Sequence, residues 1–155
     1  MTLLADETEQ ALAQRLWAQA LAVQARAHAP YSRFQVGAAL VDEHGQIHAG
    51  CNVENAAYPQ GVCAEAGAIS AMVAGGGRHI RGILVLGSGP QWVTPCGGCR
   101  QKIHEFAAPH TPVWVANEGG VLARLTLDGL LPHSFGPDHL NTAMHPTNPH
   151  PRDPA

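Results

Sequence analysis

The sequence predicts an α/β fold, a three-layer α-β-α sandwich built around a five-stranded mixed sheet. Segments with apolar residues at helical spacing alternate with segments in which every second residue is apolar, and this alternation is typical of a sheet covered by helices on both faces. The 155 residues are enough for one domain with a single core. The hydrophobic content of 45% is ordinary for a globular protein.

The first predicted elements are a long helix and a pair of strands. Residues 8–28 carry apolar side chains on one helical stripe, and Pro30 ends this pattern. Residues 34–40 alternate as a strand, with apolar side chains at every second position. A turn at residues 43–45 leads into a second strand over residues 46–51.

The middle of the chain alternates loops with helices and one strand. The loop 52–61 contains a Tyr-Pro pair that interrupts regular structure, and a helix over residues 62–74 follows and ends at three glycines. Residues 81–86 form a short apolar run that predicts a strand. The loop 87–95 then leads into a helix over residues 96–106.

Two more strands and a polar tail complete the pattern. We expect strands at residues 111–116 and 121–127, followed by a short turn at 128–131. Residues 141–155 are rich in Pro, Asn and His and have few large apolar groups, so we expect a disordered tail. The chain is therefore predicted to be one domain over residues 1–140 with this tail attached.

The distribution of charged and apolar residues disfavours several classes of function. The net charge is −3 and Lys and Arg form no cluster, which disfavours binding to nucleic acid. No apolar run approaches the ~18 residues of a membrane span. Residues 1–10 carry acids where a signal peptide carries bases, so we expect a cytoplasmic protein. Only 14% of residues are charged, which is compatible with surface buried between subunits.

Three of the four cysteines form a split constellation at the starts of two predicted helices. Cys63 precedes Glu65 by two residues, and Cys96 and Cys99 form a Cys-x-x-Cys pair. In a reducing compartment such thiols indicate a metal or catalysis, and the positive ends of helices favour thiolates. Structural zinc normally has four protein ligands and catalytic zinc three, so this set predicts catalytic zinc with Glu65 as proton carrier. The fourth cysteine, Cys51, is interpreted as a buried apolar residue.

Other interpretations of the thiols remain at this point. A lone Cys-x-x-Cys pair also occurs in redox proteins and zinc ribbons, but a ribbon needs a second such pair, which the chain lacks. A structural zinc module for protein binding would need a fourth protein ligand. His104 is the nearest candidate, and it lies about 140° around the predicted helix from Cys99.

The order Cys-x-Glu followed by Pro-Cys-x-x-Cys is the zinc deaminase signature, and the chain resembles the small cytidine deaminases. The resemblance extends over residues 31–140, with the family's motifs in the same order. These motifs are a first-strand motif at residues 31–39, a nucleoside-binding loop at 52–58 and a C-terminal segment at 130–135.

The resemblance implies a cytidine deaminase-like fold and the hydrolytic deamination of cytidine or deoxycytidine to uridine or deoxyuridine, a step of pyrimidine salvage. It implies that Cys63, Cys96 and Cys99 bind Zn2+, which activates water, and that Glu65 passes protons to the pyrimidine ring and the departing amine.

The resemblance also implies the contacts to the substrate. Asn52 and Glu54 bind the ribose hydroxyls, whereas without the resemblance they would be interpreted as a turn residue and a solvated charge. Tyr58 and Phe135 reach the site across a subunit interface, which implies a homotetramer with shared active sites. The remaining implied contacts are Phe34 and the backbone of Ala64 and Thr94.

The sequence departs from the family at Ala66, where many all-cysteine members have an arginine that donates to the thiolates. The loss of this cation is expected to weaken the activation of water. Either another donor compensates, or the small Ala66–Gly67 pair accompanies a different substrate, such as a modified cytosine nucleoside or a nucleoside-like antibiotic. An enzyme that edits RNA or DNA is disfavoured by the acidic balance.

Overall fold

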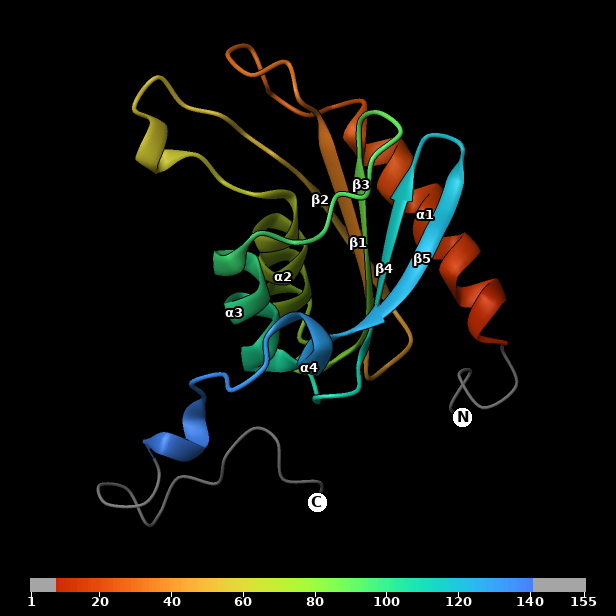
Figure 1. Ribbon diagram of the computed structural model, residues 1–155, viewed down its shortest axis with the longest axis vertical. Helices are drawn as coiled ribbons and strands as arrows, with labels where there is room; N and C mark the ends of the chain where they lie inside the picture. The colour runs from red at the N-terminus through yellow and green to blue at the C-terminus, as the bar shows by residue number, and fades with distance from the viewer. Residues whose placement is uncertain (1–7, 141–155) are drawn as a thin grey trace.

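The computed structural model describes residues 8–140, which form one five-stranded sheet with helices on both faces (Figure 1). Residues 1–7 and the predicted tail 141–155 lie outside the described residues. The sheet order is β2-β1-β3-β4-β5. The strands are β1 (Val36–Asp42), β2 (Ile47–Cys51), β3 (Ile80–Gly87), β4 (Pro112–Asn117) and β5 (Gly120–Thr126). The α-helices are α1 (Glu9–Gln24), α2 (Ala64–Ala74), α3 (Gly97–Phe106) and α4 (Leu127–Leu130).

The sheet is mixed, as predicted. Strand β1 pairs antiparallel with both β2 and β3, and β4 pairs antiparallel with β5. The parallel pair is β3 and β4, and the connection between them contains α3, as parallel neighbours require a crossover. This crossover places the start of α3 at the end of the sheet where β3 finishes.

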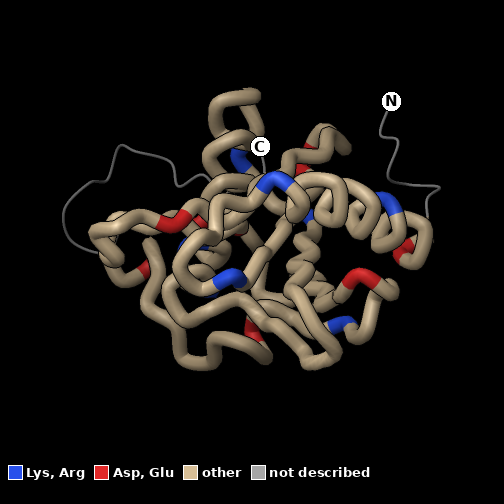
Figure 2. The backbone as a smooth tube through the Cα atoms, turned by 90° about the horizontal axis from the view of Figure 1, so that it is seen from above, with Lys and Arg blue, Asp and Glu red and all other residues tan. Residues whose placement is uncertain are grey.

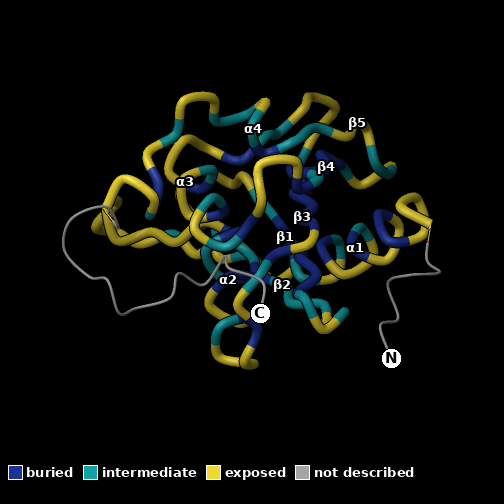
Figure 3. The backbone as a smooth tube through the Cα atoms, turned by 90° about the horizontal axis from the view of Figure 1, so that it is seen from below, coloured by how far each residue is buried: buried dark blue, intermediate teal, exposed yellow. Residues whose placement is uncertain are grey.

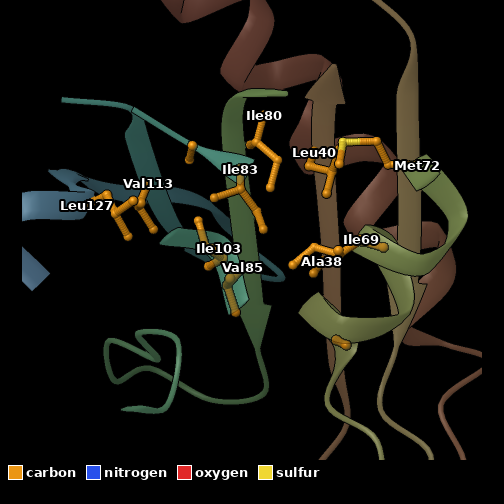
Figure 4. Close-up of a cluster of buried hydrophobic side chains, with 13 residues drawn as sticks. Ala38, Leu40, Ile69, Met72, Ile80, Ile83, Val85, Ile103, Val113 and Leu127 are labelled. Carbon is orange, nitrogen blue, oxygen red and sulfur yellow. The ribbon is translucent and has the colours of Figure 1, made fainter. Parts of the chain in front are cut away.

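Each face of the sheet carries its own hydrophobic core, which confirms the three-layer prediction. Helix α1 packs Leu16 and Ala20 against one face, together with Leu84 of β3. On the opposite face Ile69 of α2 and Ile103 of α3 pack against the same strands (Figure 4). Figure 3 shows the buried residues concentrated in β1, β3 and β4 and the exposed ones in the surrounding loops.

Helix α2 lies unusually close to the edge strand β2, and a glycine makes this approach possible. A Cβ atom on Gly50 would lie 2.4 Å from the backbone nitrogen of Ala68 and 2.5 Å from the carbonyl oxygen of Ala64. Any larger residue at this position would push the first turns of α2 away from the sheet. Gly50 therefore helps to set where α2 begins.

The described surface carries charges of both signs. Figure 2 shows Lys and Arg interspersed with Asp and Glu along the described backbone. Among residues 8–140, none of the helices combines the length and the apolar character needed to cross a membrane.

Candidate metal centre and substrate cleft

The three predicted metal ligands converge at the starts of two helices. Cys63 is the N-cap residue of α2, Cys96 is the N-cap residue of α3, and Cys99 lies in the first turn of α3. Their sulfur atoms all lie within 4.8 Å of one another. Cys63 and Cys96 are exposed and Cys99 is buried. The cluster is therefore open to solvent on one side.

This donor set fits zinc. Three thiolates bound to Zn2+ in tetrahedral geometry, with Zn–S distances of about 2.3 Å, have sulfur atoms about 3.8 Å apart, so small side-chain movements suffice. Among the described residues, the group contains no fourth His, Cys, Asp or Glu. The nitrogen Nε2 of His104 is instead 3.0 Å from the hydroxyl of Ser134. The described residues thus do not provide the fourth ligand that a structural zinc module needs.

The surroundings of the thiols explain why they need a cation. Burial raises the pKa of the Cys63 thiol, and burial together with the negative charges of Glu65 and Cys63 raises the pKa of Cys99. Burial also opposes ionisation of Cys96, but hydrogen bonds from the Cys99 backbone N–H and from the neighbouring thiols outweigh it and lower the pKa. Three thiolates at this place are stable only with positive charge between them.

Glu65 is the second residue of α2, and its side chain is only 4% exposed. Its negative charge acts on all three thiols, which places the carboxylate beside the metal cluster. A carboxylate in this position is available to exchange protons with a molecule bound in the open place of the cluster.

A cleft of about 540 Å³ adjoins the cluster at Cys63. Asn52, Glu54 and Tyr58 line it, so the structure brings these three predicted contacts to one site. Tyr58 lines the cleft of its own chain, whereas it was expected to reach the site across a subunit interface. Other residues also line the cleft and were not predicted as individual contacts, although the first four lie within the motifs at 31–39 and 52–58: Tyr31, Ser32, Val53, Asn55, Gly61 and Val62.

The carboxylate of Glu54 is fixed by the segment before β1. It accepts hydrogen bonds from the backbone N–H of Tyr31, at 2.8 Å, and from the backbone N–H and the hydroxyl of Ser32. The Ser32 hydroxyl, followed by these backbone N–H groups, lowers the pKa of Glu54 despite slight desolvation. Glu54 therefore enters the cleft as an ionised and pre-oriented acceptor. Ser32 belongs to the motif at residues 31–39, which was the available signal for its importance.

The side chain of Asn52 also has structural partners. Its amide nitrogen donates to the Phe34 carbonyl, and its amide oxygen accepts from the Val36 N–H, each at 2.8 Å. One N–H and one oxygen lone pair remain for a ligand. Asn52 thus both fixes the entry into β1 and presents polar atoms to the cleft.

The other predicted contacts lie outside the residues that line the cleft. The methyl group of Ala64 is buried in the core, which leaves its backbone as the group to meet a ligand. Phe34 is exposed, and Phe135 is 58% exposed and stacks on His139. Within one chain, the structure does not bring Phe135 to the cleft. Cys51 is half-buried, not fully buried as expected.

Comparison with known proteins supports the interpretation of the cluster. Residues 10–115 match the family model described as the cytidine and deoxycytidylate deaminase zinc-binding region. The chain is 39% identical to the cytidine deaminase of Sporosarcina psychrophila over 130 residues, which cover 84% of this chain and 96% of that protein. It is 40% identical over 122 residues to the cytidine deaminase of Halalkalibacterium halodurans, covering 77% of this chain and 92% of that one.

The fold has close counterparts among solved structures. The crystal structure of cytidine deaminase from Burkholderia pseudomallei superposes with a TM-score of 0.73 at 39% identity. This match covers 83% of the present chain and all of the other. The family-model match over residues 10–115 contains both helix starts and all three clustered thiols. The chain therefore belongs to the zinc-dependent cytidine and deoxycytidylate deaminase family.

Proposed function

We propose that this protein deaminates cytidine and deoxycytidine to uridine and deoxyuridine, with release of ammonia, as a step of pyrimidine salvage. The observation that carries the proposal is the three-thiol cluster, to which residues 8–140 add no fourth protein ligand, at the same helix start as the buried Glu65 and adjoining the cleft. The reaction consumes one water molecule: a C4–O bond forms and the C4–N bond breaks.

The proposed chemistry divides between the metal and Glu65. When bound, Zn2+ supplies a Lewis acid that makes water a nucleophile near neutral pH. The carboxylate of Glu65 accepts a proton from the attacking water, transfers it to N3 of the ring and later protonates the amine that leaves. Burial of Glu65 keeps these transfers away from bulk solvent.

The proposed substrate contacts follow from the cleft. The ionised Glu54 accepts a hydrogen bond from a ribose hydroxyl, and the remaining amide atoms of Asn52 contact the same diol. Phe34 and Tyr58 provide apolar surface near the base. The backbones of Ala64 and Thr94 contact its polar edge.

We further propose a homotetramer in which subunits share active sites. Phe135 is 58% exposed, and exposed aromatic groups are enriched at interfaces. The position of Phe135 outside its own cleft supports its use by a neighbouring subunit. A cytoplasmic location agrees with thiols that must stay reduced.

The direct test is to incubate the zinc-loaded protein with cytidine and with deoxycytidine and to measure ammonia and the change in ultraviolet absorbance. We expect both nucleosides to be deaminated and free cytosine to react far more slowly, because it lacks the ribose that Asn52 and Glu54 bind. The absence of ammonia from both nucleosides would overturn the proposal.

A modified cytosine nucleoside or nucleoside-like antibiotic is the second candidate substrate, and the small side chain of Ala66 beside the acid favours it. Inclusion of N4-methylcytidine and 5-methylcytidine in the same assay decides between the candidates by their relative kcat/KM.

We also propose that residues 1–140 carry the activity. Truncation after Leu140 is expected to leave kcat/KM unchanged.

A further inference from the structure

Arg100 follows the metal ligand Cys99 on α3, and its half-buried guanidinium group donates to three acceptors in two separate parts of the chain. Its Nε donates to the Pro95 carbonyl at 2.8 Å. Its two terminal nitrogens donate to the Leu130 carbonyl at 2.8 Å and to the Thr94 hydroxyl at 2.9 Å. The side chain therefore connects the loop before α3 with the end of α4.

Two of the atoms that Arg100 holds flank the ligand Cys96. The backbone N–H of Arg100 donates to the Cys96 carbonyl at 2.9 Å, while its side chain holds the preceding carbonyl of Pro95. Two successive peptide groups are thus fixed by one residue. The Cα–Cβ bond of Cys96 projects from between them, so these bonds restrict the direction of its sulfur.

The bond to Leu130 anchors this arrangement to the rest of the fold. Leu130 is the last residue of the single-turn helix α4, where carbonyl groups lack partners within the helix, and Arg100 supplies a donor to its carbonyl. The neighbouring side chain of Gln101 donates to the Phe135 carbonyl at 2.9 Å. Two consecutive residues of α3 therefore attach the C-terminal segment to the helix whose start carries two of the metal ligands.

We propose that Arg100 is a positioning residue for the metal site: it fixes the segment from Thr94 to Cys96 and so orients the Cys96 thiolate. Only the planar fork of arginine satisfies the three acceptors at once, whereas lysine provides a single point charge. Arg100 acts on backbone and hydroxyl oxygens, so this role differs from direct donation to the thiolates. The inference rests on the proposed function only in that both require zinc at the three thiols, and none of its measurements uses the substrate.

The primary measurement is the rate at which each zinc-loaded variant loses metal to a chelator, in the absence of substrate. We expect zinc to leave Arg100→Ala about 10- to 100-fold faster than it leaves the wild type. Losses of metal affinity of this size are typical when a residue that orients a metal ligand is removed. Arg100→Lys is expected to recover only part of this loss. Lys102→Ala removes an exposed cation from the same helix and serves as the matched control, with zinc retention unchanged.

Thr94 gives a milder and independent test. Thr94→Val removes the acceptor for Arg100 and is expected to speed zinc loss, whereas Thr94→Ser keeps the hydroxyl and should restore retention. In the Arg100→Ala background, Thr94→Val should add little, because the bond is already lost. In the Co2+-loaded protein, the thiolate-to-cobalt charge-transfer band should shift in Arg100→Ala and in Thr94→Val. In Lys102→Ala this band should keep its wild-type position.

A merely structural role would give a different result. If Arg100→Ala and Thr94→Val lower the melting temperature but keep the wild-type zinc retention and cobalt spectrum, the proposal is wrong. If Arg100→Ala does not fold, the comparison of Thr94→Val with Thr94→Ser decides the question. A wild-type protein that holds zinc but leaves cytidine intact would contradict the proposed function and not this inference.

Discussion

Glu65 and Glu54 are both carboxylates near the cleft, but their surroundings give them different chemistry. Glu65 is buried beside the three thiols at the start of α2. Glu54 is more exposed, and its oxygens are already engaged by Ser32 and Tyr31. A buried carboxylate with nearby metal suits proton transfer, whereas a fixed and ionised acceptor suits binding of a diol.

Replacing Glu65 with Gln tests the first assignment. The amide has nearly the same shape but cannot carry the proton, so kcat for cytidine is expected to fall by about 10²- to 10⁴-fold. Metal analysis should find zinc bound as in the wild type, since the thiols are unchanged. A Glu65→Gln variant with most of its activity would contradict this role.

Replacing Ser32 with Ala tests how Glu54 is held. Loss of one hydrogen bond worth roughly 0.5–1.5 kcal/mol leaves the carboxylate less oriented, so KM for cytidine is expected to rise by about 2- to 10-fold with kcat little changed. Steady-state kinetics with 2′,3′-dideoxycytidine provide the control, because this substrate lacks the hydroxyls that Glu54 binds. An equal increase in KM for both substrates would argue against the assignment.

Among individual residues, the sequence predicted those whose partners lie within one short motif. Cys63 and Glu65 share the first turn of one helix, so their proximity follows from helical geometry. The contact between Ser32 and Glu54 spans 22 residues, and the residue after Ser32, Arg33, has a φ of 58°. A non-glycine residue rarely adopts this conformation, and no periodic pattern predicts it.

The hairpin of β1 and β2 is fixed by Asp42, a buried carboxylate at the end of β1. Its Oδ1 accepts hydrogen bonds from the backbone N–H groups of His44 and Gln46, each at 2.9 Å. Its Oδ2 lies 2.8 Å from Nε2 of His48 on β2. Burial acts to raise the pKa of Asp42, but these hydrogen bonds outweigh it and the pKa lies below its ordinary value. The turn therefore depends on an ionised Asp42.

Replacing Asp42 with Asn is expected to lower the free energy of unfolding by about 1–3 kcal/mol at pH 7, because a buried set of N–H donors loses its charged acceptor. A lowered folded-state pKa contributes stability above the unfolded pKa of ~3.9, and this contribution disappears as the pH falls through the folded value. Urea titrations at pH 7 and at pH 3 measure both effects. The difference between wild type and variant should shrink at pH 3, and a constant difference would contradict the argument.

The elements themselves were largely predictable, and the differences have physical causes. Strand β1 begins at Val36, not at the expected Phe34, because the Asn52 side chain takes the place of a strand partner there. Helix α1 ends at Gln24, before the expected His28, which pairs with Val53 instead. Apolar periodicity determines the buried face of an element, whereas side-chain bonds from distant residues determine its ends.

The proposed homotetramer makes a prediction for the whole molecule. If Phe135 serves a neighbouring site, Glu65→Gln and Phe135→Ala variants each lose activity, but mixed tetramers contain some sites with both native residues. Co-refolding equal amounts of the two is expected to restore activity at about a quarter of the sites. The ammonia assay measures this recovery, and the two variants mixed without refolding serve as the control. No recovery in tetramers shown to be mixed would contradict shared sites.

The placement of the thiols on two successive crossover helices also has a consequence for the order of folding. Cys63 follows β2, whereas Cys96 and Cys99 follow β3, and β2 and β3 lie on either side of β1, so long-range pairing of these strands holds the two helix starts together. Such long-range pairing is slow compared with local helix formation. A growing chain on the ribosome cannot assemble the cluster before β3 and the start of α3 with Cys99 have emerged. In contrast to zinc fingers, whose folding is driven by the metal, this protein is expected to acquire zinc as one of its last steps of maturation.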